Sequence, residues 1–186
     1  ISQSWSVISG AAPMNRTRRA ILSACRHLVN EEEGISLLLT PPFDKTPNNP
    51  GYIKNYYPGI RENGGQYSHA AAWLAIAAAQ LGDHRLAYTL FTMLNPIHTT
   101  SKKRDALKYE KEPYVMTADI ASATPCIGRG GWSWYTGSAG WMYQGLVKCF
   151  LGIRKQGDYI VIDPAAPEHF GDYTVHYRYG SSSYHI

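Results

Sequence analysis

The polar stretch from Glu62 to His69, with the sequence ENGGQYSH, gathers several chemically active side chains around a pair of glycines. It contains a carboxylate, amides, hydroxyls and one imidazole, which together supply hydrogen-bond donors, acceptors and a titratable ring. Gly64 and Gly65 permit backbone conformations that are closed to other residues, and they leave room for a ligand to approach the main chain. The pattern predicts a turn that recognises a polar ligand.

A buried helix is predicted directly after this turn. From His69 onward the run HAAAWLAIAAAQLG is apolar on every face, which is typical of a helix enclosed by other elements. His69 therefore stands where the polar turn meets the wall of a buried helix. Composition alone favours a histidine satisfied by a backbone carbonyl, and a ligand-binding role is the alternative at this stage.

A second stretch, GRGGWSWYTGSAG from Gly128 to Gly140, has the same design and leads into a helix predicted over Trp141 to Leu151. The N–H groups at such a helix start are suited to binding an anion. An ordinary glycine-rich turn is the simpler interpretation. Trp132, Trp134 and Tyr135 have two open roles, because they could stack on a sugar ring or wedge the loop against the helices.

The rest of the chain must position these two stretches, and its pattern is helical up to about residue 152. Asp83 is predicted to cap a helix that ends at Asn95-Pro96. Residues 35–61 contain five prolines and read as a long ordered connection, and residues 98–111 read as a charged surface excursion. From about residue 157 the spacing of the apolar residues changes from the helical period to the alternation that is typical of strands. The other predicted elements are helices at residues 1–10 and 16–29 and strands at 159–162, 173–179 and 183–186.

Composition restricts the class of protein. The chain has 186 residues, enough for one domain with a sizeable core, and its net charge is only +4. The basic residues form small groups, which excludes an extended nucleic-acid surface. Cys25, Cys126 and Cys149 are odd in number and widely spaced, so no disulfide framework and no metal site is expected, and a reducing compartment fits best.

No apolar run is long enough for a membrane span, since even residues 70–79 fall short. The chain opens without methionine in a helical pattern and stops inside a strand-like one, so we expect a piece of a longer protein. No internal period is visible, which counts against a helical-repeat scaffold.

Several joined motifs carry a resemblance to a known family. They are LLTPPFD (38–44), PGYIKNYYPGIRENGGQYSHAAAW (50–73), MLNPI (93–97), YEKEPYV (109–115), GRGGWSWYTGSAGWMY (128–143), IDPAAPEHF (162–170) and YRYG (177–180). Together they resemble the C-terminal part of glycoside hydrolase family 94. That family contains inverting glycoside phosphorylases, such as cellobiose phosphorylase, and the phosphorylase-like region of cyclic β-1,2-glucan synthases. The sequence of residues 51–67 is most similar to the glucan synthase branch.

The resemblance implies a mainly α fold in two parts. Residues 1–152 would be the last helices and loops of an (α/α)6 barrel, as in six-hairpin glycosidases, and residues 153–186 would begin a C-terminal β domain. It also implies a transferase of carbohydrate metabolism that acts on β-linked glucose oligomers, with inorganic phosphate as co-substrate and no cofactor or metal. The expected location is the cytoplasm, or the cytoplasmic side of the inner membrane for a glucan synthase.

The resemblance assigns residues by motif. His69, Thr136 and Gly137 match the phosphate-binding histidine, threonine and glycine of the family. Glu62 matches a sugar-contacting carboxylate, and Gln66, Trp134 and Tyr135 are assigned to sugar binding with it. These matches shift the interpretation of His69 from a structural to a functional residue.

The expected catalytic acid is absent from the matched motifs. In the family it is an aspartate in an upstream barrel segment, together with an arginine that holds phosphate, so the chain alone is expected to be inactive. Its partners would be a β-glucan or β-glucoside, phosphate, the remainder of the parent chain, or copies of itself, because residues 70–79 would present apolar faces. A noncatalytic sugar-binding module and a helical interaction module are the alternative functions.

Overall fold

The computed structural model describes all 186 residues, which form seven α-helices and four two-stranded antiparallel ladders. The helices are α1 (Ser2–Ile8), α2 (Met14–Leu28), α3 (Ser68–Gln80), α4 (His84–Leu94), α5 (Pro96–Thr99), α6 (Lys103–Tyr109) and α7 (Thr136–Gly145), with a π-helical turn η2 (Leu146–Phe150) and 3₁₀ turns η1 (Gly51–Asn55) and η3 (Glu168–Phe170). The ladders pair β1 (Val29–Asn30) with β2 (Ile35–Ser36), β3 (Gln66–Tyr67) with β4 (Asp119–Ile120), β5 (Ile153–Gln156) with β6 (Tyr159–Ile162), and β7 (His176–Tyr179) with β8 (Ser182–His185).

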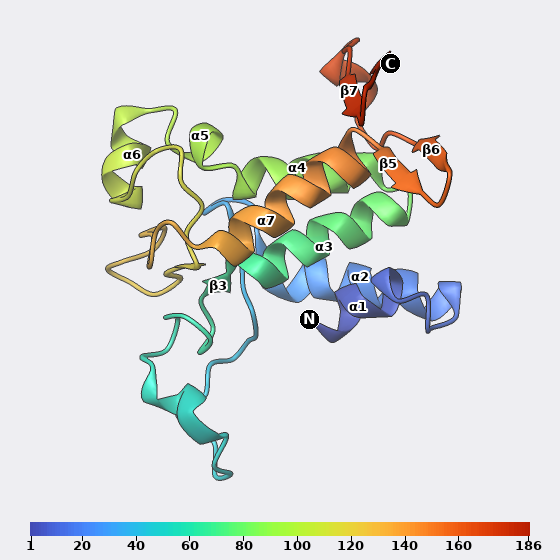
Figure 1. Cartoon of the computed structure of the whole chain (residues 1–186). Coiled ribbons are helices and arrows are strands. Elements are labelled where there is room, and N and C mark those ends of the chain that lie inside the picture. The colour runs from blue at the N-terminus through green and yellow to red at the C-terminus, as the bar shows by residue number, and fades with distance from the viewer.

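Helix α3 is the centre of the molecule. It packs against α1, α2, α4, α7 and η2, and Figure 1 shows it between α7 and the α1–α2 pair. Ala72, Ala75, Ala77 and Ala78 are completely buried in the main hydrophobic cluster, and their short side chains let the neighbouring helices approach closely. The expectation that this helix exposes apolar faces is therefore wrong, because neighbours within the chain enclose it.

Local signals placed several helix ends correctly. The Asp83 carboxylate accepts a hydrogen bond from the Leu86 amide at 3.0 Å and caps α4, as predicted. The Asn95 side chain accepts from the Ile97 amide at 3.1 Å, so Asn95 both ends α4 and caps α5.

Two helices differ from the prediction. Helix α7 begins at Thr136, five residues before the predicted start at Trp141. Its glycine-rich first turn is held by Ser138, which is completely buried and donates to carbonyl oxygens of Thr117 and Tyr135. The charged stretch 98–111, which was predicted to be a surface excursion, contains helix α6. Tyr109 at the end of this helix is buried in a small hydrophobic cluster with Ile35 and Ile120. Tertiary contacts thus override the weak local propensity of the glycine-rich start of α7, whereas α6 consists largely of good helix formers such as Lys, Arg, Ala and Leu.

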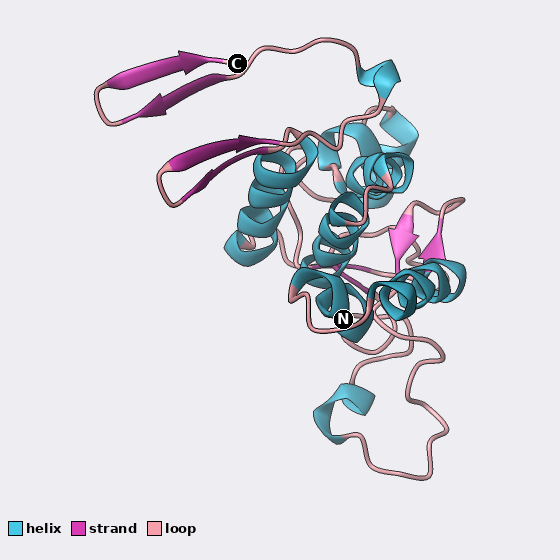
Figure 2. Cartoon of the chain, turned by 90° about the vertical axis from the view of Figure 1, so that its right-hand side faces the viewer, coloured by secondary structure: helices cyan, strands magenta, loops and turns pink.

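The helical part of the chain is followed by two β-hairpins, β5–β6 and β7–β8, the first of which begins at Ile153, close to the predicted change from helices to strands. Both of these hairpins project beyond the helices in Figure 2. Strand β5 was not predicted, since IRKQ carries little of the strand pattern. The division into a barrel domain and a β domain stays a prediction, as does the barrel itself. None of the helices combines the length and the apolar character that crossing a membrane would require.

Candidate functional site

The starts of α3 and α7 meet at one end of the helical body, which Figure 1 shows next to β3. The contact joins His69 to Gly137, two residues 68 positions apart. A Cβ added to Gly137 would lie 2.3 Å from Cε1 and 2.6 Å from Nε2 of His69. The imidazole edge therefore lies directly against the α-carbon of Gly137, a place that only glycine can occupy.

Neither helix start at this contact is capped by a side chain. The Ser68 amide donates to the Ala118 carbonyl oxygen, whereas Thr136 and Gly137 open α7 with Thr136 exposed to solvent. Uncapped N–H groups and the helix dipole favour a negative charge at such a position. The structure thus brings the three predicted phosphate residues, His69, Thr136 and Gly137, to one place; that they bind phosphate stays a prediction.

Aromatic rings surround the His69 imidazole. The Tyr67 ring stacks on it with centroids 5.9 Å apart, and the rings of Trp73 and Tyr135 lie at 5.8 Å and 5.9 Å. Burial lowers the pKa of His69 below its usual 6.5, so the imidazole is neutral at pH 7. Its Nδ1 is buried without a hydrogen-bond partner. In a neutral imidazole each ring nitrogen can take part in one hydrogen bond, one nitrogen as donor and the other as acceptor.

The hydroxyl groups of Tyr67 and Tyr135 bridge the two glycine-rich stretches. Their oxygens are 3.4 Å apart, and this bond together with burial raises the pKa of Tyr67 to about 12. The Tyr67 phenol therefore stays protonated and can donate to a ligand hydroxyl. Tyr135 was predicted as a sugar contact, whereas Tyr67 was recognised only as part of the polar turn.

Glu62 lies close enough to Tyr67 for its negative charge to contribute to the raised pKa of that phenol. It forms an ion pair with Arg61, whose Nε is 3.5 Å from a carboxylate oxygen, and both side chains are mostly buried. The Arg61 guanidinium also lies over the Trp132 ring, 4.3 Å from its centroid. Glu62 is thus held in place by Arg61. From its position beside the polar turn, Arg61 was expected either to brace the loop or to assist in binding an anion.

Two predicted sugar contacts lie elsewhere. Gln66 is 1% exposed, and its Oε1 accepts from the Ser36 amide at 2.7 Å, so it ties β3 to β2 inside the protein. Trp134 is exposed, but its indole N–H donates to Glu112 at 2.9 Å and its ring contacts Tyr114. The structure does not bring either side chain to the His69 cluster.

Asp119 is the polar residue that sequence reasoning missed. It pairs with Tyr67 in the β3–β4 ladder, is 4% exposed, and has one carboxylate oxygen without a hydrogen-bond partner. Burial raises its pKa above the ordinary 3.8, although Arg61 opposes the change. The signal was available in EPYVMTADI, because a carboxylate at the end of an apolar run is costly to bury.

Asp119→Asn is expected to remove a pH dependence of stability. Because folding raises the pKa of Asp119, its full contribution to stability is present below pH 3.8 and is lost as pH rises through the folded value. The stability difference between Asp119→Asn and the natural protein should therefore shift in favour of asparagine between pH 3.8 and 7, as measured by urea unfolding. A difference that does not change with pH would show that Asp119 titrates normally.

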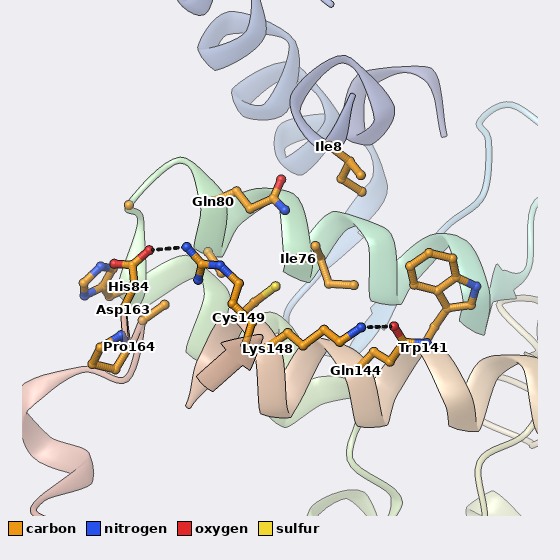
Figure 3. A pocket seen from close by; sticks show the side chains of 14 residues that line it. Ile8, Ile76, Gln80, His84, Trp141, Gln144, Lys148, Cys149, Asp163 and Pro164 are labelled. Carbon is orange, nitrogen blue, oxygen red and sulfur yellow. Dashed lines mark hydrogen bonds and ion pairs between the residues drawn. The ribbon is translucent and has the colours of Figure 1, made fainter. Parts of the chain in front are cut away.

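One sizeable cavity lies away from this cluster, between the far ends of α3 and α7. It has a volume of about 530 Å³, and Figure 3 shows its lining. Its charged groups are already engaged, since Arg154 pairs with Asp163 at 3.1 Å and Lys148 donates to Gln144 at 2.8 Å. Size alone therefore does not mark the candidate site.

A helical body with aromatic rings, a buried carboxylate and uncapped helix starts at one end has the features of a carbohydrate-active protein. Residues 1–152 match the family model described as the Glycosyl hydrolase 94 superfamily, catalytic domain, and the chain belongs to this family. The resemblance seen in the sequence motifs is thereby confirmed.

Individual relatives agree with this assignment. Over its full 186 residues the chain is 45% identical to the cyclic beta-(1,2)-glucan synthase NdvB of Rhizobium meliloti, of which it covers 7%. It is 29% identical over 188 aligned residues to the N,N'-diacetylchitobiose phosphorylase of Vibrio furnissii, covering 23% of it. It is 30% identical over 122 residues, 58% of the chain, to the 1,2-beta-oligoglucan phosphorylase of Listeria innocua, covering 11% of that protein. The chain thus spans less than a quarter of each of these relatives.

Proposed function

We propose that the chain is part of an inverting glycoside phosphorylase or of the phosphorylase-like region of a glucan synthase, and that it acts on β-1,2-linked glucose oligomers. The β-1,2 linkage in this proposal is supported by the similarity to a cyclic β-1,2-glucan synthase and a 1,2-β-oligoglucan phosphorylase. The observation that carries the proposal is the contact of the His69 imidazole edge with Gly137 at the uncapped start of α7.

Phosphate fits this arrangement chemically. Inverting hydrolysis requires a carboxylic acid for the leaving oxygen and a carboxylate base that activates water. Phosphate is already anionic and needs no base, so the protein has only to hold it under the anomeric carbon. In our proposal the Thr136 hydroxyl, the first amides of α7 and His69 hold the phosphate oxygens, and Glu62 and Tyr135 contact the sugar.

The leaving oxygen still requires a proton. No aspartate of the chain lies in a motif matched to the family's general acid, and we assign that role to a residue outside these 186 positions. General acid catalysis is typically worth about a hundredfold or more in rate. The bond to the anomeric carbon breaks as phosphate attacks from the opposite face, giving a glycosyl phosphate with inverted configuration and a shortened glucan.

We further propose the cytoplasm as the location, because a phosphorylase of this type uses intracellular phosphate. The three cysteines are free in the structure, which a reducing compartment would maintain.

His69→Ala and Thr136→Ala test this proposal in the protein at its natural length. Each is expected to weaken the use of phosphate by about ten- to a hundredfold, since a hydrogen bond to a charged group contributes roughly 1.5 to 3 kcal/mol. The measurement varies phosphate at saturating glucan and then glucan at saturating phosphate. A loss confined to glucan affinity or folding, with unchanged phosphate dependence, would make both residues structural.

A further inference from the structure

Two histidines face each other on the last hairpin of the chain, β7–β8. His176 lies opposite His185 in the ladder, and both side chains are exposed. Figure 2 shows this hairpin projecting away from the helical body. Neither histidine belongs to the candidate site described above, so the pair requires an explanation of its own.

The pairing pattern of the strands brings these two side chains close together. The neighbouring residues Val175 and Ile186 exchange two backbone hydrogen bonds, at 2.7 Å and 3.0 Å. In an antiparallel ladder such pairs alternate with pairs that share no backbone hydrogen bond, and His176 and His185 form a pair of this second kind. The Cα atoms of such pairs are only about 4.5 Å apart, and their side chains are the closer ones of the ladder.

The two ring nitrogens have the spacing of a metal chelate. The Nδ1 atoms of His176 and His185 are 2.8 Å apart. Two nitrogen ligands that bind one metal at about 2.0 Å and at right angles also lie about 2.8 Å apart, whereas tetrahedral coordination requires about 3.3 Å. The spacing therefore fits the right-angled geometry of Cu²⁺ and Ni²⁺ better than the tetrahedral geometry of Zn²⁺.

The protonation of the pair is compatible with a metal ion. Without metal, one Nδ1 donates its proton to the other Nδ1, which accepts it. A metal ion would take the place of this shared proton, and the donor ring would then carry its proton on Nε2, so that both Nδ1 lone pairs become ligands. A small rotation of the exposed rings brings both lone pairs onto one ion.

The surroundings limit the strength of binding. The two histidines supply two ligands and water supplies the others, since no third His, Cys, Asp or Glu completes a metal-binding group. Arg178 lies two residues further along β7 on the same face, and its positive charge opposes a cation. The site therefore favours metals that prefer imidazole, and it excludes Mg²⁺, which prefers oxygen ligands.

We propose that His176 and His185 form a two-histidine site for a divalent late transition metal of the Ni²⁺ and Cu²⁺ class. The ion links β7 to β8 and stabilises the hairpin against opening, because it binds the paired strands better than the separated ones. The expectation of no metal site rested on the cysteines and on the family resemblance, whereas these histidines meet only in the folded hairpin. The proposal is independent of phosphate chemistry.

Native-state hydrogen exchange tests the proposal on the protein at its natural length, with NiCl₂ as the probe. At a Ni²⁺ concentration ten times the dissociation constant, exchange in the peptide of residues 173–186 should slow about tenfold. His176→Ala and His185→Ala should each lose this effect. His27→Ala is the matched control, because His27 is an exposed histidine on α2, and it should retain the effect. MgCl₂ should leave the exchange unchanged.

Calorimetric titration with NiCl₂ gives an independent reading. The natural protein and His27→Ala should each bind one more Ni²⁺ per chain than either hairpin variant. Each variant is compared with and without metal, so a hairpin weakened by the substitution itself does not imitate the result. Equal stoichiometry in all four proteins, or slowing that persists in both hairpin variants, would reduce the pair to a cross-strand hydrogen bond and overturn the site. Phosphorolysis in metal-free buffer should be the same in all four proteins, so its failure in the natural protein would count only against the phosphorylase proposal.

Discussion

Gly137→Ala is expected to lower kcat/KM for phosphate by about a hundredfold or more. The added methyl carbon would lie 2.3 Å from Cε1 of His69, far inside van der Waals contact, and neither the backbone of α7 nor the enclosed ring can yield easily. His69 or the first turn of α7 must move, and a displacement of about 1 Å in a positioned site is enough for such a loss. Steady-state phosphorolysis at saturating glucan measures it.

Gly140→Ala is the control in the same helix. Gly140 lies one turn further along α7 and has open space where a Cβ would stand. The replacement should leave phosphate use unchanged and stabilise α7 by up to about 1 kcal/mol, because alanine is the better helix former. If the two alanine variants behave alike, the contact between His69 and Gly137 has no role in phosphate use.

Asn63→Ala is expected to lower the free energy of opening of the 40–60 segment by about 3 kcal/mol. Asn63 is completely buried and forms three hydrogen bonds, accepting from the Phe43 amide at 2.7 Å and donating to the Phe43 and Tyr56 carbonyl oxygens at 3.2 Å and 2.8 Å. Alanine would leave backbone groups of the connection without partners inside the protein, at about 1 kcal/mol or more each.

Native-state hydrogen exchange reports this change directly, as roughly a hundredfold faster exchange in peptides from residues 40–60. Asn49→Ala provides the comparison, because Asn49 lies in the same connection but is exposed and makes only a local bond to the Gly51 amide. Protection that survives in Asn63→Ala would show that the connection is held by its apolar residues, such as Phe43, and not by this side chain.

The sequence by itself determined the features that depend on neighbouring residues. The cap at Asp83, the stop at Asn95-Pro96 and the all-round apolar pattern of α3 were predictable because a helix end and a burial pattern are written in consecutive residues. The family resemblance was equally readable, since it depends on continuous motifs such as ENGGQY and WYTGSAGW.

Tertiary structure alone decided which of the polar residues meet. His69 touches Gly137 across 68 positions, whereas Gln66, only three positions before His69, points into the interior and bonds to Ser36. Gln66 and Tyr67 are neighbours in strand β3, and successive side chains of a strand point to opposite faces. Tyr67 therefore stacks on His69 while Gln66 points away from the site.

The same reason explains why Asp119 and the early start of α7 were missed. Asp119 becomes a buried carboxylate only because β4 pairs with β3, and Thr136 becomes helical only because Ser138 finds the Thr117 carbonyl oxygen. Neither partner is close in the chain, and the energy of such contacts exceeds the local preferences, about 1 kcal/mol for each glycine, that argue against a helix there. Propensity and motif fix the elements, and packing between distant segments fixes the site.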